Sequence, residues 1–203
     1  MRGLFRQFWL DLLVSKHYVI AATIVFATSW VIGATDSSMS EFLISSTDPI
    51  RTIAQKIDES ANPQLYFFLF IFFNNLIKLV MIVFLGAFLG IWPLVGLVIN
   101  GMVLGYVLDH QVESAWIVFA KGILPHGIIE LPAIILASAY GMRFGGTLLK
   151  SFFMLLNAEK RVKAGPEVVH FLWMTVPLLL VLAGAVLTAA IIESTITYQL
   201  MRS

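Results

Sequence analysis

Five long apolar segments divide the chain, and polar or turn-forming residues separate them. The segments lie at about residues 17–35, 64–91, 93–108, 115–140 and 171–192. Most of them reach the roughly 20 residues that an α-helix needs to cross the hydrocarbon core of a bilayer. The pattern predicts an all-α fold, a polytopic membrane helix bundle with about five transmembrane helices. We expect residues 1–203 to form a single integral membrane domain.

The second and third apolar segments are separated by very few residues. Gly90 stands near the end of one segment, and Pro93 starts the next. Proline suits the first turn of a helix, where its missing N–H would have no partner in any case. The two segments are therefore expected to form a tight helical hairpin.

Two further stretches have an amphipathic pattern and are predicted to lie in the interface rather than to span. Residues 1–16 place apolar side chains at helical spacing, at Phe5, Phe8, Trp9 and Leu12. Their charged residues are expected on other faces of that helix, at Arg2, Arg6 and Asp11. Residues 141–170 form a similar cytoplasmic amphipathic segment, most clearly between Thr147 and Lys163. Docking of these helices on a partner protein is the alternative.

Composition agrees with a membrane protein and excludes several other classes. The mean hydropathy is +0.90, only 12% of the residues are charged, and the net charge is +1. The basic residues are dispersed, so the chain lacks the concentrated positive surface that nucleic-acid binding requires. The absence of cysteine excludes disulfides, iron–sulfur clusters and thiol chemistry.

Lysine and arginine gather before the first span and between the fourth and fifth spans. Basic residues are retained on the cytoplasmic side, so five spans in the cell membrane would put the N terminus in the cytoplasm and the C terminus outside. The first apolar run is expected to remain as a span and not to be cleaved as a signal peptide. Residues 36–62 become an extracytoplasmic loop, in which Asp48 and Pro49 predict the start of a short amphipathic helix.

Small residues recur one helical turn apart and predict close helix packing. The pairs are Gly86 with Gly90, Gly101 with Gly105, and Gly141 with Gly145. Such pairs allow two helix backbones to approach closely. We expect packing within the chain, while a seam between two copies is the alternative. A homodimer is the expected oligomeric state.

A small set of polar residues lies inside the predicted spans, at Asn74, Asn75, Lys78, Asn100, His126 and Glu130. An ionisable side chain at the bilayer centre costs on the order of 3 kcal/mol, so these residues are expected to face one another in the bundle interior. Estimated depths favour pairing of His126 with Asn75 and of Glu130 with Lys78. The polar residues could instead serve only to fix the helix register.

Prolines bracket the polar positions of the fourth span. Pro125 and Pro132 each remove a backbone donor, and Gly127 allows the backbone to bend. We therefore predict a kinked or broken fourth helix that lines a hydrated cavity. His126 and Glu130 could also bind a divalent metal with a third ligand from another span or subunit. Hydrolase and phosphate-binding motifs are absent, so enzymatic activity is not expected.

Two stretches of the chain resemble a known family. They are NNLIKLVMIVFLGAFLGIWPLVGLVINGMVLGY at residues 74–106 and LPHGIIELPAIILASAYGMRFG at residues 124–145, which contains the pattern Pro-His-Gly-x-x-Glu-x-x-Ala. Both resemble the stage II sporulation protein M family. In spore formers, the resemblance implies a membrane scaffold that holds cell-wall hydrolases, although relatives also occur in organisms that never sporulate.

The resemblance makes a non-enzymatic membrane scaffold or complex subunit the first functional expectation, with membrane or cell-envelope proteins as partners. The polar residues of the spans support an alternative, a transporter or channel-like protein that binds a small ion or solute. A metal-dependent intramembrane enzyme is the third hypothesis.

Overall fold

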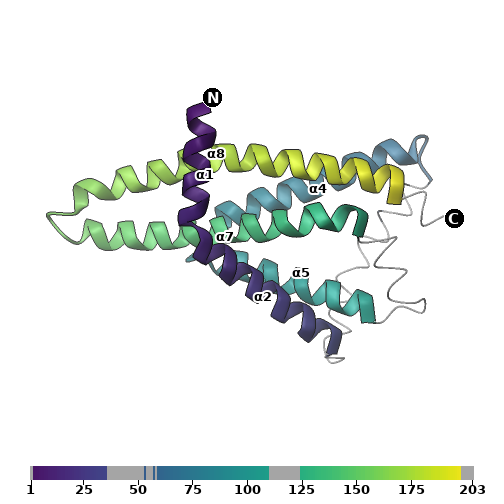
Figure 1. Cartoon of the computed structure of the whole chain (residues 1–203), viewed down its shortest axis with the longest axis horizontal. Helices are drawn as coiled ribbons and strands as arrows, with labels where there is room; N and C mark the ends of the chain where they lie inside the picture. Colours follow the sequence, from purple (N-terminus) through teal and green to yellow (C-terminus); the bar gives the residue numbers. More distant parts are fainter. Residues whose placement is uncertain (1, 36–52, 54–56, 58, 110–123, 198–203) are drawn as a thin grey trace.

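The computed structural model describes residues 2–35, 53, 57, 59–109 and 124–197, and these residues contain helices and no strand (Figure 1). Five helices are long and apolar enough to cross a membrane. The all-α membrane bundle is therefore confirmed. The elements are α1 (Arg2–Val14), α2 (Lys16–Thr35), α4 (Pro63–Leu85), α5 (Ile91–Asp109), α7 (Leu124–Leu155), α8 (Arg161–Ile192) and a π-helical turn η3 (Glu193–Thr197).

Helices α4, α7 and α8 run along the long axis of the molecule, α2 and α5 are inclined to it, and α1 crosses it (Figure 1). The turn between α7 and α8 lies farther out on the same side as α1, and the end of α8 lies on the opposite side. This arrangement suits the predicted interfacial position of α1, which stays a prediction. The short helix expected in residues 36–62 falls largely outside the described residues.

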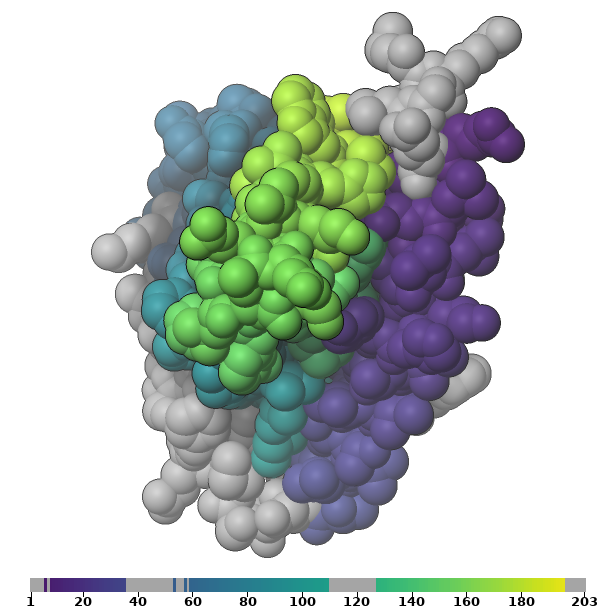
Figure 2. All heavy atoms as spheres, turned by 90° about the vertical axis from the view of Figure 1, so that its left-hand side faces the viewer, coloured from purple at the N-terminus to yellow at the C-terminus, as the bar shows by residue number. Residues whose placement is uncertain are grey.

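Helices α7 and α8 are longer than the sequence pattern predicts. Each has 32 residues, or about 48 Å, against a hydrocarbon core of about 30 Å. The stretch between Thr147 and Lys163 is therefore not a separate amphipathic helix. It consists of the ends of α7 and α8 and the turn that joins them, which stands forward in Figure 2.

Side-chain contacts hold the two arms of this hairpin together. Ser151 Oγ donates to the Ala164 carbonyl oxygen at 3.2 Å, and Lys150 Nζ lies 2.9 Å from Glu167 Oε1. Continuous helices satisfy their own backbone hydrogen bonds, and these contacts stabilise the hairpin beyond the bundle. The amphipathic pattern between Thr147 and Lys163 therefore comes from the extended ends of α7 and α8 and not from a separate helix.

Aromatic residues form the centre of the core where α1, α7 and α8 meet. The Phe144 and Phe171 rings stack with their centroids 4.9 Å apart, and the Tyr140 ring lies 6.3 Å from both Phe8 and Phe171. All four side chains are buried. This cluster links the crossing helix α1 to the α7–α8 hairpin.

Helix α1 is also attached by a buried charged network. The Asp11 carboxylate accepts two hydrogen bonds from the Arg143 guanidinium of α7, one of them 2.7 Å long. Arg143 also donates to Ser15 Oγ at 2.8 Å, and the Tyr140 hydroxyl donates to Asp11 at 3.3 Å. Asp11 therefore lies on the buried face with Phe8, where the sequence pattern placed it on another face. Its partner on α7 makes this burial favourable, because a paired and hydrogen-bonded charge can be buried.

Glycine residues set the closest helix contacts, and all of the predicted pairs pack within the chain. A Cβ atom on Gly86 would overlap the Gly141 backbone, and one on Gly145 would overlap the backbone of the α4–α5 turn. Gly101 and Gly105 of α5 approach the backbone of α2 in the same way. Packing within the chain is thus confirmed for these faces. A homodimer stays a prediction and would need another face.

The turn between α4 and α5 is tight, as predicted, but the two helices then separate. Leu89 and Gly90 have positive φ angles of 56° and 73°, which reverse the chain, and Pro93 lies in the first turn of α5. Beyond the turn, α5 packs mainly along α2, while α4 packs on α7 and α8. The separation of α4 and α5 leaves the space in which the polar residues lie.

Candidate functional site

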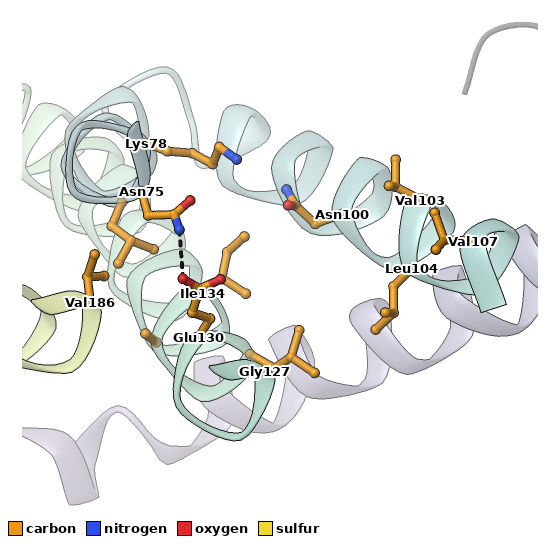
Figure 3. A pocket seen from close by; sticks show the side chains of 13 residues that line it. Asn75, Lys78, Asn100, Val103, Leu104, Val107, Gly127, Glu130, Ile134 and Val186 are labelled. Carbon is orange, nitrogen blue, oxygen red and sulfur yellow. Dashed lines mark hydrogen bonds between the residues drawn. The ribbon is translucent and has the colours of Figure 1, made fainter. Parts of the chain in front are cut away.

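A cavity of about 280 Å³ lies between α4, α5 and α7 (Figure 3). Its wall is mostly apolar and includes Leu79, Leu104 and Ile134. Four polar side chains also line it, at Asn75, Lys78, Asn100 and Glu130. Apolar walls with a few converging polar groups are typical of a site that binds a small ligand.

Asn75 and Glu130 make the direct polar contact between α4 and α7. Asn75 Nδ2 donates to Glu130 Oε1 at 2.7 Å (Figure 3). Among the described residues, Lys78 forms no ion pair with Glu130. The direct contact of Glu130 is therefore with Asn75, about one helical turn from Lys78, while the charge of Lys78 acts on Glu130 without an ion pair.

The glycine contacts explain this register. Helices α4 and α7 run in the same direction (Figure 1), and Gly86 meets Gly141 at one end of their interface. Asn75 precedes Gly86 by eleven residues, and Glu130 precedes Gly141 by the same eleven. Eleven residues are slightly more than three full turns, so the same two helix faces meet again at Asn75 and Glu130.

Lys78 and Asn100 occupy the side of the cavity toward α5. Lys78 extends from α4 in the direction of α5, and Asn100 faces it from that helix (Figure 3). Asn100 Nδ2 donates to the Gly96 carbonyl oxygen of its own helix at 2.7 Å. Neither residue joins the bond between Asn75 and Glu130, so the cavity contains a cationic side and an anionic side.

A second hollow of about 420 Å³ adjoins the cavity, and Lys78 and Asn100 line both. Its remaining wall comes from α4 and α5 and is apolar except for Asn74. Asn74 Nδ2 donates to Asn75 Oδ1 at 3.5 Å, so Asn74 belongs to the same polar group but lines only the second hollow. The side chain of His126 lies outside the described part of the structure, so its predicted pairing with Asn75 stays untested.

The fourth span is continuous over its described length. Helix α7 runs from Leu124 through Pro132 to Leu155, and Gly127 lines the cavity. Pro125 lies in the first turn of the described helix, where proline is well tolerated. The predicted break is therefore absent between residues 124 and 155, and Pro132 removes one backbone hydrogen bond without ending the helix.

Sequence reasoning missed Glu193 as a neighbour of the cavity. Glu193 starts the π-helical turn η3, is half-buried, and interacts electrostatically with Glu130. Beside it, Gln64 Nε2 of α4 donates to the Ser194 carbonyl oxygen at 3.2 Å. The apolar pattern placed Glu193 beyond the end of the last span. A π-helical turn has no simple sequence signature, although such turns are frequent at functional sites.

The metal hypothesis remains a prediction. Among the described residues, no group of three histidine, aspartate or glutamate side chains has the spacing of a metal site. Glu130 has an amide partner in Asn75. His126, the other predicted ligand, precedes Glu130 by four residues in the same helix, and its side chain lies outside the described part.

Comparison with known proteins identifies the family of the chain. The stage II sporulation protein M family matches residues 18–198, from the first span to the end of the last. An uncharacterized protein of Methanocaldococcus jannaschii is 31% identical over 138 residues, which cover 68% of this chain and 59% of that relative. This chain thus spans less than two thirds of the relative's length. No solved structure matches this chain. Because the family match covers most of the chain, including the residues that line the cavity, the chain belongs to the stage II sporulation protein M family.

Proposed function

We propose that this membrane protein binds a small polar or charged group between its helices, as a transporter or channel-like protein does. The supporting observation is that Lys78 and Glu130 line one cavity and interact electrostatically across it without forming a direct ion pair. A lysine and a glutamate that served only to fix the helix register would be expected to form a closed ion pair, because an unpaired charge is costly inside a membrane. A bound group with complementary charges would stabilise both side chains.

Thermal unfolding of the purified protein in mild detergent tests this function. A ligand that binds only the folded state raises the melting temperature. A panel of ions, small polar solutes and lipids should contain a compound that raises the melting temperature of the wild-type protein. Glu130→Gln and Lys78→Met should abolish that increase.

Lys150→Met is the matched control, because Lys150 is exposed on the hairpin and lies outside the cavity. It should keep the ligand-induced increase. The function is contradicted if no compound affects the wild-type protein, or if the cavity variants respond as the wild-type protein does.

A scaffold or complex subunit is a second candidate function. Its support is the end of the α7–α8 hairpin, which exposes the apolar side chains of Leu155, Leu156 and Val162. A photo-crosslinking residue at Leu156 should then capture one specific membrane or envelope partner. That crosslink should persist in Glu130→Gln. Loss of the crosslink in this variant would mean that complex formation depends on the cavity.

A further inference from the structure

The two adjoining hollows differ in chemistry and share one edge. The cavity contains Glu130 and Asn75, whereas the second hollow is a groove of apolar side chains between α4 and α5. Lys78 and Asn100 line both and mark the junction. A ligand that occupied the whole space would meet apolar side chains, then a cation, and then a carboxylate.

The groove lies on the outside of the bundle. Ile77, Met81 and Trp92 line it and are 55%, 51% and 52% exposed. In a chain with five membrane spans, an apolar outer wall contacts acyl chains. An acyl chain of the bilayer can therefore enter the groove sideways, without crossing water.

From this order of groups, we infer that the ligand is a phospholipid. Its acyl chain lies in the groove, its phosphate lies against Lys78, and an ammonium or hydroxyl group of the head donates to Glu130. The inference rests on the proposed function and names its ligand. A soluble ion or solute would use the cavity but would leave the apolar groove without a role.

Selectivity follows from the carboxylate. Phosphoethanolamine offers N–H donors and phosphoglycerol offers O–H donors, whereas phosphocholine ends in a quaternary ammonium without a donor. The head groups with donors should therefore bind more tightly. Loss of a hydrogen bond to a charged group weakens binding by about tenfold or more.

Native mass spectrometry of the full chain in mild detergent tests the inference. The chain is titrated with phosphatidylethanolamine, phosphatidylglycerol and phosphatidylcholine that carry the same acyl chains. The first two should bind more tightly than the third. Lys78→Met should weaken all three by about tenfold, and Glu130→Gln should remove the preference for ethanolamine. Lys150→Met should change nothing.

Gly96→Phe separates the groove from the cavity, because Gly96 lines only the groove. This variant should weaken phospholipid binding and should leave binding of soluble glycerophosphoethanolamine unchanged. Equal binding of all three lipids to the wild-type and Lys78→Met proteins would overturn the inference. The bound lipids would then be annular lipids, which surround a membrane protein without occupying a specific site. If the soluble head group binds but Gly96→Phe does not weaken phospholipid binding, the inference is overturned and the proposed function stands. Failure of every probe to bind would overturn the inference, and the proposed function would then be decided by the ions and solutes of the thermal-unfolding panel.

Discussion

Asp11 and Lys78 show how differently single charges are accommodated in one bundle. Asp11 is buried, and its carboxylate accepts hydrogen bonds from Arg143 and Tyr140. Lys78 lines a cavity and has no ion-pair partner among the described residues. The buried charge of Asp11 therefore has a structural role, whereas Lys78, which faces the cavity, is the charge that we assign to binding.

The contact between Asp11 and Arg143 predicts a structural role. Asp11→Asn keeps the shape of the side chain but leaves the guanidinium without a counter-charge, which should lower the free energy of unfolding by on the order of 3 kcal/mol. Thermal unfolding in detergent measures the change. Glu167→Gln, in the more exposed pair with Lys150, should cost less than about 1 kcal/mol. Similar losses in both variants would contradict the structural role of Asp11.

At the scale of elements, backbone contacts through glycine fix the register of the helices. The contact of Gly86 with Gly141 aligns α4 and α7, and the same alignment brings Asn75 to Glu130 three turns away. The sequence contained this information in the equal spacing of the two pairs. The depth estimates missed it because the ends of a span cannot be located in the sequence to better than about one helical turn, which is about 5 Å.

Gly86→Ala should therefore destabilise the bundle. Its Cβ would overlap the Gly141 backbone, which cannot move as a flexible side chain can, so a loss of about 1–3 kcal/mol or more is expected. Gly184→Ala is the matched control, because a Cβ there has no neighbour within 4 Å. It should be neutral or slightly stabilising in detergent unfolding. Equal melting temperatures for the two variants would contradict the assigned packing.

At the scale of the whole molecule, the structure places α1 and the α7–α8 turn on the same side (Figure 1). The basic residues of these two segments favour the cytoplasmic side, so we propose a cytoplasmic N terminus and an extracytoplasmic C terminus. The chain has no cysteine, which makes a single introduced thiol an unambiguous reporter of sidedness.

Asn157→Cys, in the hairpin turn, should resist a membrane-impermeant maleimide added to intact cells. Ala61→Cys, which lies between α2 and α4, should react with it. Permeabilised cells provide the control, because both thiols should then react. The reverse labelling pattern in intact cells would show that the orientation is opposite to the one proposed.

The sequence by itself determined the class of fold, the number of spans, the small-residue packing faces and the polar residues of the cavity. These features follow from the thickness of the bilayer and from the cost of polar groups in it, which act on each segment separately. Only the tertiary structure decided that Asn75 bonds to Glu130, that Asp11 is buried against Arg143, and that Glu193 lies near the cavity. Those contacts depend on helix register and on how far each helix continues, and both are set by packing between segments that are distant in the sequence.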